Sequence, residues 1–418
     1  MFSFSSSTLS GVLFMLFVSA AQAESYTLTQ TLAAAQRYSA ELSASRNESQ
    51  ALNAMAESAR ELPDDPRLKF GLENLPVQGS NDRRFTREGM TMQRVGVMQQ
   101  YVSADKRERK AQTLLAESQS VNAQAQTIRA ALQRDTAQAW LDLAISSRAL
   151  EAARQLLAET ARQQSVQKAS VGAGSAAPES VLALRITESA MRDNVTLAER
   201  DVQIAQTRLF ELTGRTITTA AGKMPAYQRL PAEEHTLEEG VDLHPEVLAA
   251  TREANTAKAR SAESAIAAIP DVEVEVYYGR RAEGNDDLAG VMFTVDLPLF
   301  QSHRQDKNHA ADLSRTMQAN DRLALTERQH IAQVRTLVAD YRAAQIRWSR
   351  QLHDVLPLLR QRLTLLAAQY RAGQSDLSAL LEARRSVLDS ELAATQAEKE
   401  MARTWAAIHW LIPEELAQ

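Results

Sequence analysis

The chain has 418 residues, no cysteine, a formal net charge of −5, and only 14 glycines and 11 prolines. Because turns depend on glycine and proline, their scarcity predicts long helices and argues against a sandwich, a propeller or a long series of βαβ units. Without cysteine, the chain cannot have disulfides, thiolate metal sites, a cysteine nucleophile or a lipidated N-terminal cysteine. It has 47 basic and 52 acidic residues, so it does not show the excess of basic residues that is typical of nucleic-acid binders.

Residues 9–20 form a mostly apolar run that ends in Ala21-Gln22-Ala23. This pattern of small residues predicts a signal peptide, residues 1–23, that is cleaved after Ala23. The run is too short for a stable membrane helix, and no other apolar stretch reaches the roughly 20 residues that such a helix needs. We therefore expect an exported protein without a membrane-spanning helix.

The rest of the chain repeats one order of elements: helix, strand pair, very long helix, short turn, helix. The first repeat covers 24–213, with strands at about 66–76 and 90–102 and coiled-coil helices at 104–171 and 178–213. A linker, 214–240, leads to the second repeat, 241–412, with strands at about 271–280 and 288–300 and coiled-coil helices at 302–371 and 376–410, followed by a tail, 413–418. At an offset of 199 residues, Gly174 coincides with Gly373 and Arg185 with Arg384, which supports a duplication.

The predicted strands have one apolar and one polar face. In the clearest of them, valines at 272, 274 and 276 alternate with Glu273 and Glu275. This alternation suits a half-buried soluble hairpin or a membrane barrel with lipid outside and water inside. Four strands cannot close a barrel that holds water, and an open sheet in lipid leaves unpaired edges, so membrane strands require further chains. Glu273, Glu275 and Asp296 are then candidates for the lumen of the barrel.

The two longest predicted helices, 104–171 and 302–371, are each on the order of 100 Å long. Leu114, Val121 and Ile128 are seven residues apart, which indicates coiled-coil packing. Pro357 is expected to disturb the second helix because it removes a helix hydrogen bond. Helices of this length suit a conduit across the periplasm better than a single soluble domain.

Both predicted helical turns carry recognisable sequences. Tyr370-Arg371-Ala372-Gly373-Gln374-Ser375-Asp376-Leu377, continuing to Arg384, resembles the tip motif of the outer membrane factor (TolC-like) family, and Val171-Gly172-Ala173 is similar to the element at that family's other tip. Gly71-Leu72-Glu73-Asn74-Leu75-Pro76-Val77, together with residues 90–99, resembles the heavy-metal efflux (CzcC/CusC-like) branch. The resemblance covers essentially the whole chain after the signal peptide.

The resemblance implies a mainly α protein with a membrane β-barrel: a homotrimeric channel-tunnel embedded in outer membrane lipid, with a large periplasmic portion. A periplasmic membrane fusion (adaptor) protein would dock on its tip, with an inner-membrane resistance-nodulation-division pump behind it. The matching positions make Tyr370, Asp376 and Glu382 the candidate channel gate. Val171, Gly172, Gly174, Gly373 and Ser375 are the candidate adaptor-docking residues. Some members of the metal branch carry a lipidated cysteine that this chain lacks, so anchoring is expected to rest on the barrel.

Simpler interpretations exist for several of these residues. The glycines suit helix C-termini, and Asp376 suits a helix N-cap. Met90, Met92 and Met98 share one parity of a predicted strand, which fits a soft-metal site but also ordinary apolar packing. The seven histidines are scattered, at positions 235, 244, 303, 309, 330, 353 and 409. No catalytic motif is present, so we expect neither an enzyme nor a bound metal or cofactor.

The sequence therefore predicts the exit duct of a tripartite resistance-nodulation-division efflux system that exports heavy-metal cations. Drug efflux and type I protein secretion remain alternatives with the same fold. A soluble periplasmic coiled-coil scaffold or adaptor is the alternative from another class.

Overall fold

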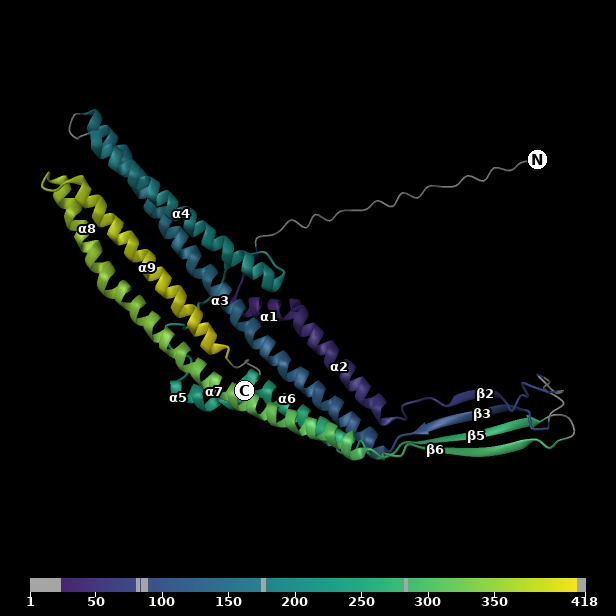
Figure 1. Ribbon diagram of the computed structural model, residues 1–418. Coiled ribbons are helices and arrows are strands. Elements are labelled where there is room, and N and C mark those ends of the chain that lie inside the picture. The colour runs from purple at the N-terminus through teal and green to yellow at the C-terminus, as the bar shows by residue number, and fades with distance from the viewer. Residues whose placement is uncertain (1–23, 80–82, 84–88, 174–177, 282–284, 412–418) are drawn as a thin grey trace, which may run out of the picture.

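The computed structural model describes residues 24–79, 83, 89–173, 178–281 and 285–411. The expected signal peptide, the tail 413–418 and Gly174 lie outside the described residues. Figure 1 shows an elongated molecule in which long helices connect two helical turns at one end to a sheet at the other. None of the helices in the described ranges combines the length and the apolar character that crossing a membrane requires.

One order of elements occurs twice along the chain, which confirms the predicted repeat. The first repeat contains α1 (Leu28–Tyr38), α2 (Ala40–Arg60), β2 (Arg67–Glu73), β3 (Met92–Tyr101), α3 (Ala104–Gly172) and α4 (Pro178–Thr213). The second contains α6 (Pro245–Ser264), β5 (Val272–Arg281), β6 (Leu288–Val295), α7 (Gln305–Arg350), α8 (Leu356–Arg371) and α9 (Leu377–His409). Figure 1 shows the two copies side by side.

The linker between the repeats is folded. It contains β4 (Ile217–Ala220), which pairs in parallel with β1 (Glu24–Tyr26) at the start of the first repeat. It then forms α5 (Glu234–Glu239) and a 3-10 turn, η1 (Gly240–Leu243), which leads into α6. The linker thus ties the second repeat to the beginning of the first.

Helix α3 spans 69 residues, close to 100 Å at the rise of an α-helix. It begins after Ser103, whose hydroxyl accepts a hydrogen bond from the backbone N–H of Lys106 at 3.3 Å. Asp105 adds a negative charge in the first turn, where the helix dipole favours it. This capping therefore determines where α3 begins after strand β3.

The second long helix, expected over 302–371 with a disturbance at Pro357, is interrupted twice. A 3-10 turn, η2 (Gln301–His303), precedes it, and a π-helical segment, η3 (Gln351–Val355), separates α7 from α8. Pro357 has no N–H, so it cannot donate the bond that continues an α-helix. The irregularity lies in the turn just before Pro357, and the Oε1 atom of Gln351 there accepts a hydrogen bond of 2.8 Å from Ser390 of α9.

The four long strands form one antiparallel sheet in the order β2-β3-β5-β6, so β3 and β5 join the two hairpins. Two strands are shorter than expected. β2 ends at Glu73 because Asn74 takes a φ of 55°, and Pro76 follows. β6 ends at Val295 rather than near 300, since Pro298 cannot donate to the ladder and accepts a turn bond of 3.2 Å from Gln301.

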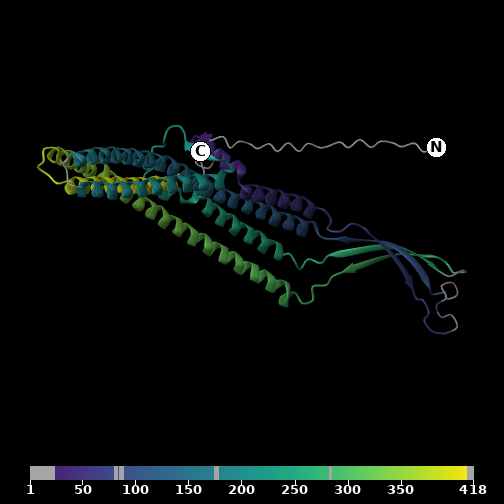
Figure 2. The same ribbon diagram turned by 90° about the horizontal axis from the view of Figure 1, so that it is seen from above.

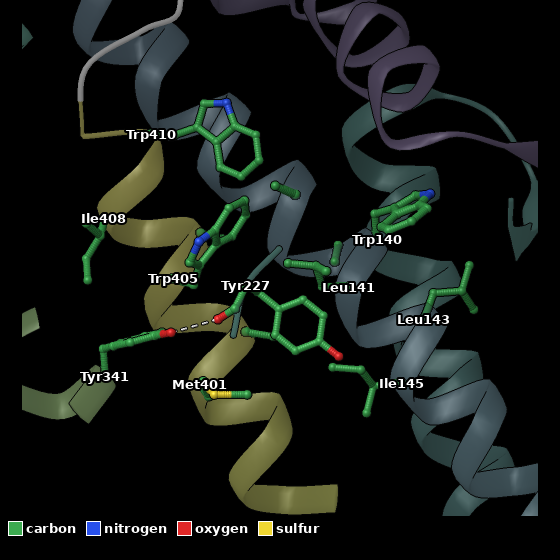
Figure 3. Packing of buried hydrophobic residues seen from close by; sticks show 14 of the residues in the cluster. Trp140, Leu141, Leu143, Ile145, Tyr227, Tyr341, Met401, Trp405, Ile408 and Trp410 are labelled. Carbon is green, nitrogen blue, oxygen red and sulfur yellow. Dashed lines mark hydrogen bonds between the residues drawn. The ribbon is translucent and has the colours of Figure 1, made fainter. Parts of the chain in front are cut away.

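The largest buried cluster lies near the middle of the long helices. Figure 3 shows Trp140 of α3, Tyr341 of α7, and Met401 and Trp405 of α9 around Tyr227 of the linker. The Tyr341 hydroxyl donates to the backbone oxygen of Tyr227 at 3.0 Å. The two repeats and the linker therefore share one core.

Candidate functional site

The α3–α4 and α8–α9 turns lie at the same end of the molecule, at the left of both Figure 1 and Figure 2. We call this end the tip. It brings together the sequence-predicted gate and docking residues that the structure describes, although the two turns are about 200 residues apart in the chain.

Gly373 shapes the second turn of the tip. It has a φ of 69°, its N–H bonds to the Tyr370 oxygen at 3.1 Å, and the N–H of Gln374 bonds to the Gln369 oxygen at 2.8 Å. This is a Schellman C-terminus, in which a left-handed residue without a Cβ ends the helix. Gly172, in contrast, is the last residue of α3. Apart from its chain neighbours and its own helix, no atom of the described residues lies within 4 Å of the Cβ position of either glycine.

Tyr370 connects the two halves of the tip. Its hydroxyl donates to Oε1 of Gln167 in α3 at 3.1 Å, and Nε2 of Gln167 donates to Oγ of Ser180 in α4 at 2.8 Å. Gln167 is 7% exposed and bonds to both helices with one amide. The sequence analysis missed Gln167, because a glutamine four residues before Val171 carries no signal of a partner more than 200 residues away.

The other predicted tip residues have no such contact. Asp376 occupies the expected N-cap position of α9, but its side chain makes no capping hydrogen bond. Asp376 and Glu382 are exposed, whereas Val171 and Ser375 are half-buried. Both carboxylates are therefore available to solvent at the tip.

Arg384 makes a second, weaker contact across the tip. Its side chain is 8% exposed, and its nearest carboxylate is Glu159 of α3, with Nη2 and Oε1 3.7 Å apart. Nε and Nη1 of Arg384 have no hydrogen-bond partner among the described residues, and burial lowers the pKa of the guanidinium. A buried cation with one distant partner stabilises the packing of α9 against α3 poorly.

Towards the middle of the molecule, α9 is bound much more firmly. Lys399 contacts Asp201 at 2.9 Å, Arg403 contacts Asp142 at 2.8 Å, and Glu398 contacts Arg148 at 2.8 Å. The partners come from α3 and α4 of the first repeat. The contacts between repeats are thus strong near residues 398–403 and sparse at the tip.

The sheet has two chemically different faces. By the strand register, Leu68, Phe70, Val97, Val276 and Phe293 share one face, and all of them are exposed. The opposite face carries the ionisable strand residues Arg67, Lys69, Glu73, Arg94, Glu273, Glu275 and Arg281. We call these the apolar face and the polar face.

The predicted lumen carboxylates differ from one another. Glu275 is buried, and its two oxygens contact Lys69 at 2.9 Å and Arg94 at 2.6 Å. Glu273 is half-buried on the same face, and Asp296 is exposed just beyond the end of β6. The sequence identified the carboxylates through their alternation, but not the cations that neutralise Glu275, which come from the other repeat.

Two of the scattered histidines meet in the fold. The Nδ1 atoms of His244, before α6, and His330, in α7, are 3.3 Å apart, and Nε2 of His330 is 2.5 Å from Oε2 of Glu246. Both rings are buried, at 1% and 5% exposure. Burial, followed by the neighbouring His330, lowers the pKa of His244 to about 4. The described residues contain no group of three or more histidine, aspartate or glutamate side chains placed to hold a metal ion.

This pair predicts a loss of stability in mild acid. In the unfolded chain a histidine binds a proton below about pH 6.5, whereas His244 in the folded protein binds one only below about pH 4. Between these two values protons therefore bind preferentially to the unfolded chain, and the free energy of unfolding decreases as the pH falls from 6.5 towards 4. The shift corresponds to on the order of 3 kcal/mol. The groups around His244 are His330 of α7, Glu246 of α6 and, through Glu246, Arg134 of α3.

Thermal unfolding between pH 4 and 7 measures the effect. His244→Gln is expected to flatten this pH dependence. His235→Gln, at an exposed position in α5, is the control and should leave it intact. An equally steep decline in His244→Gln would show that other groups cause it.

The fold is similar to that of several solved outer membrane proteins. CusC, in a study of transmembrane channel formation, superposes with a TM-score of 0.77 at 13% identity, covering 93% of this chain and 92% of that one. The outer-membrane channel OprN gives 0.74 at 18% identity, with 92% and 89% covered, and VceC of Vibrio cholerae gives 0.72 at 15%, with 92% and 95% covered. No protein-family model and no curated protein sequence matches the chain. The predicted channel-tunnel fold is confirmed.

Proposed function

We propose that this protein is the outer membrane exit duct of a tripartite efflux system. One observation supports this most strongly: a sheet with an exposed apolar face and a charged opposite face continues directly into helices of about 100 Å. Such a sheet is stable with lipid on one side and water on the other. CusC and OprN, which share the fold, are described as channels.

The sheet leaves the outer edges of β2 and β6 unpaired within the described chain. Because open edges are too costly in lipid, we infer that β6 of one copy pairs with β2 of the next and that three copies close the barrel. The helices would then form a tunnel in the periplasm.

Fractionation and planar-bilayer recording test this function. The protein is expected in the outer membrane fraction as a trimer, and the purified trimer should form ion-conducting pores. Recovery of folded protein in the soluble periplasmic fraction would contradict the duct and favour the scaffold alternative.

We further propose that adaptor docking and gating both occur at the tip. The open backbones of Gly172 and Gly373 and the neighbouring Val171 and Ser375 offer the docking surface. The gate is the Tyr370 contact between repeats, while the ion pairs near residues 398–403 hold the helices further along. The π-helical segment η3, between these two regions, is the natural place for α8 to bend.

In a trimer, the exposed Asp376 and Glu382 would form acidic rings at the narrow end of the tunnel, which attract cations. Asp376→Asn combined with Glu382→Gln is therefore expected to lower block of the pore by divalent cations. Single-channel conductance with added divalent salt measures this. Unchanged block and conductance in the double variant would exclude both residues from the gate.

We propose heavy-metal cations as the exported substrate, on the resemblance of residues 71–77 and 90–99 to the metal-efflux branch. A strain that lacks the gene is expected to become sensitive to metal salts. Sensitivity to drugs alone, or a defect in protein secretion alone, would favour the corresponding alternative with the same fold.

A further inference from the structure

We propose that Arg94 determines the ion selectivity of the barrel section, because it neutralises carboxylates that would otherwise attract cations on the polar face. This inference rests on the proposed function, since it requires the polar face to line a water-filled pore. It adds to that function a statement about charge. The three carboxylates Glu273, Glu275 and Asp296 suggested an acidic lumen, whereas the pairing with Arg94 makes the charge of the lumen nearly balanced.

Arg94 lies at the centre of an ion-pair network across three strands. Its Nη1 contacts Oε1 of Glu73 in β2 at 2.7 Å, and its Nη2 contacts Oε1 of Glu275 in β5 at 2.6 Å. The guanidinium carbon lies 3.6 Å from the ring centroid of Tyr277. Only 13% of the side chain is exposed. One cation is therefore held by two carboxylates and an aromatic face at once.

Gly96, on the same face, leaves space for Glu275 and for Tyr277, on whose ring Arg94 lies. A Cβ atom on Gly96 would lie 3.0 Å from Cβ of Tyr277 and 3.2 Å from Oε1 of Glu275. Both distances are tighter than ordinary contacts, so a side chain at this position would push the ring or the carboxylate aside. The Arg94–Glu275 pair at its centre is mostly buried, at 13% and 11% side-chain exposure, whereas Glu73 is more exposed.

The charges of the polar face nearly cancel. Its described strand residues include four basic side chains, Arg67, Lys69, Arg94 and Arg281, and three carboxylates, Glu73, Glu273 and Glu275. Arg94 contacts two of these carboxylates, Glu73 and Glu275, and Lys69 also contacts Glu275. Loss of Arg94 removes one positive charge from each copy and leaves Glu73 without its partner, so the local potential becomes more negative.

Reversal potentials across a KCl gradient test the inference on the reconstituted wild-type and variant channels. Arg94→Gln is expected to raise the K⁺/Cl⁻ permeability ratio by about two-fold or more at 0.1 M salt, and by less at 1 M salt, where screening is stronger. Glu275→Gln should shift the ratio in the opposite direction, and the double variant should lie near the wild type. Arg280→Gln removes the same charge from the apolar face of β5 and should leave the ratio unchanged.

The outcomes separate this inference from the proposed function. A conducting Arg94→Gln channel with the wild-type ratio overturns the selectivity role and leaves the duct intact. Absence of conductance from the wild-type protein overturns the duct itself. If Arg94→Gln does not assemble, the Glu275→Gln channel tests the inference instead. An unchanged K⁺/Cl⁻ permeability ratio in Glu275→Gln contradicts a selectivity set by the Arg94–Glu275 pair. Arg94→Lys, which keeps the charge, should keep the wild-type ratio.

Discussion

Phe293→Arg is expected to abolish assembly of the protein in the outer membrane. Phe293 lies on β6, 68% of its surface is exposed, and its cross-strand neighbour is Val274. A lipid-facing arginine costs up to about 2–4 kcal/mol in a barrel, depending on its depth, so three copies cost up to roughly 6–12 kcal/mol per trimer. The variant should be lost from the trimer fraction of purified outer membranes and accumulate as aggregate or degraded chain.

Thr294→Arg is the matched control. It adds the same side chain one residue along β6, on the polar face and opposite Glu273. This variant is expected to assemble in normal amounts, because its charge meets water and a carboxylate. Equal assembly of both variants would show that the apolar face does not contact lipid. Folded, soluble Phe293→Arg protein in the periplasm would favour the scaffold alternative.

Tyr370→Phe is expected to make the closed channel leak. The substitution removes the hydroxyl that bonds to Gln167 and leaves the ring in place. A hydrogen bond of this kind contributes about 1 kcal/mol, so the loss in three copies that open together amounts to about 3 kcal/mol. Such a change raises the ratio of open to closed channels by roughly a hundred-fold. The effect is large because the Arg384–Glu159 pair, which also crosses the tip, is 3.7 Å long and compensates little.

Open probability in planar bilayers measures the leak, and cells should become sensitive to a large hydrophilic antibiotic. Gln167→Leu removes the other partner of the same bond and should give the same phenotype. Tyr101→Phe loses an exposed hydroxyl at the end of β3, next to the start of α3 and far from the tip, and should behave as wild type. A closed Tyr370→Phe channel with normal trimer assembly would show that this contact does not hold the tip shut.

Local patterns predicted much of the fold. Helix α4 spans Pro178–Thr213, the expected residues, because Pro178 suits a first helical turn and the apolar residues that follow recur at helical spacing. The strand faces were predictable as well, since alternation fixes which side chains share a side. The disturbance near Pro357 was expected, but its π-helical form and the early end of β6 were not, because each depends on how a proline is accommodated by its neighbours.

The candidate sites were predictable in part. The tip motif identified Tyr370 and Gly373, and alternation identified Glu275. Their partners were not, because Gln167 lies 203 residues from Tyr370 and Lys69 lies 206 residues from Glu275. His244 and His330, 86 residues apart, looked scattered for the same reason.

The sequence by itself therefore determined the long helices, the four long strands and their apolar faces, because these properties depend on residues a few positions apart. Only the tertiary structure decided which of the charged and polar side chains are paired. The order β2-β3-β5-β6 places Arg94 between Glu73 and Glu275, and the docking of one repeat on the other places Tyr370 against Gln167. Because a neutralised carboxylate attracts cations less strongly, the ion selectivity of the proposed pore is expected to depend on this pairing as well as on composition.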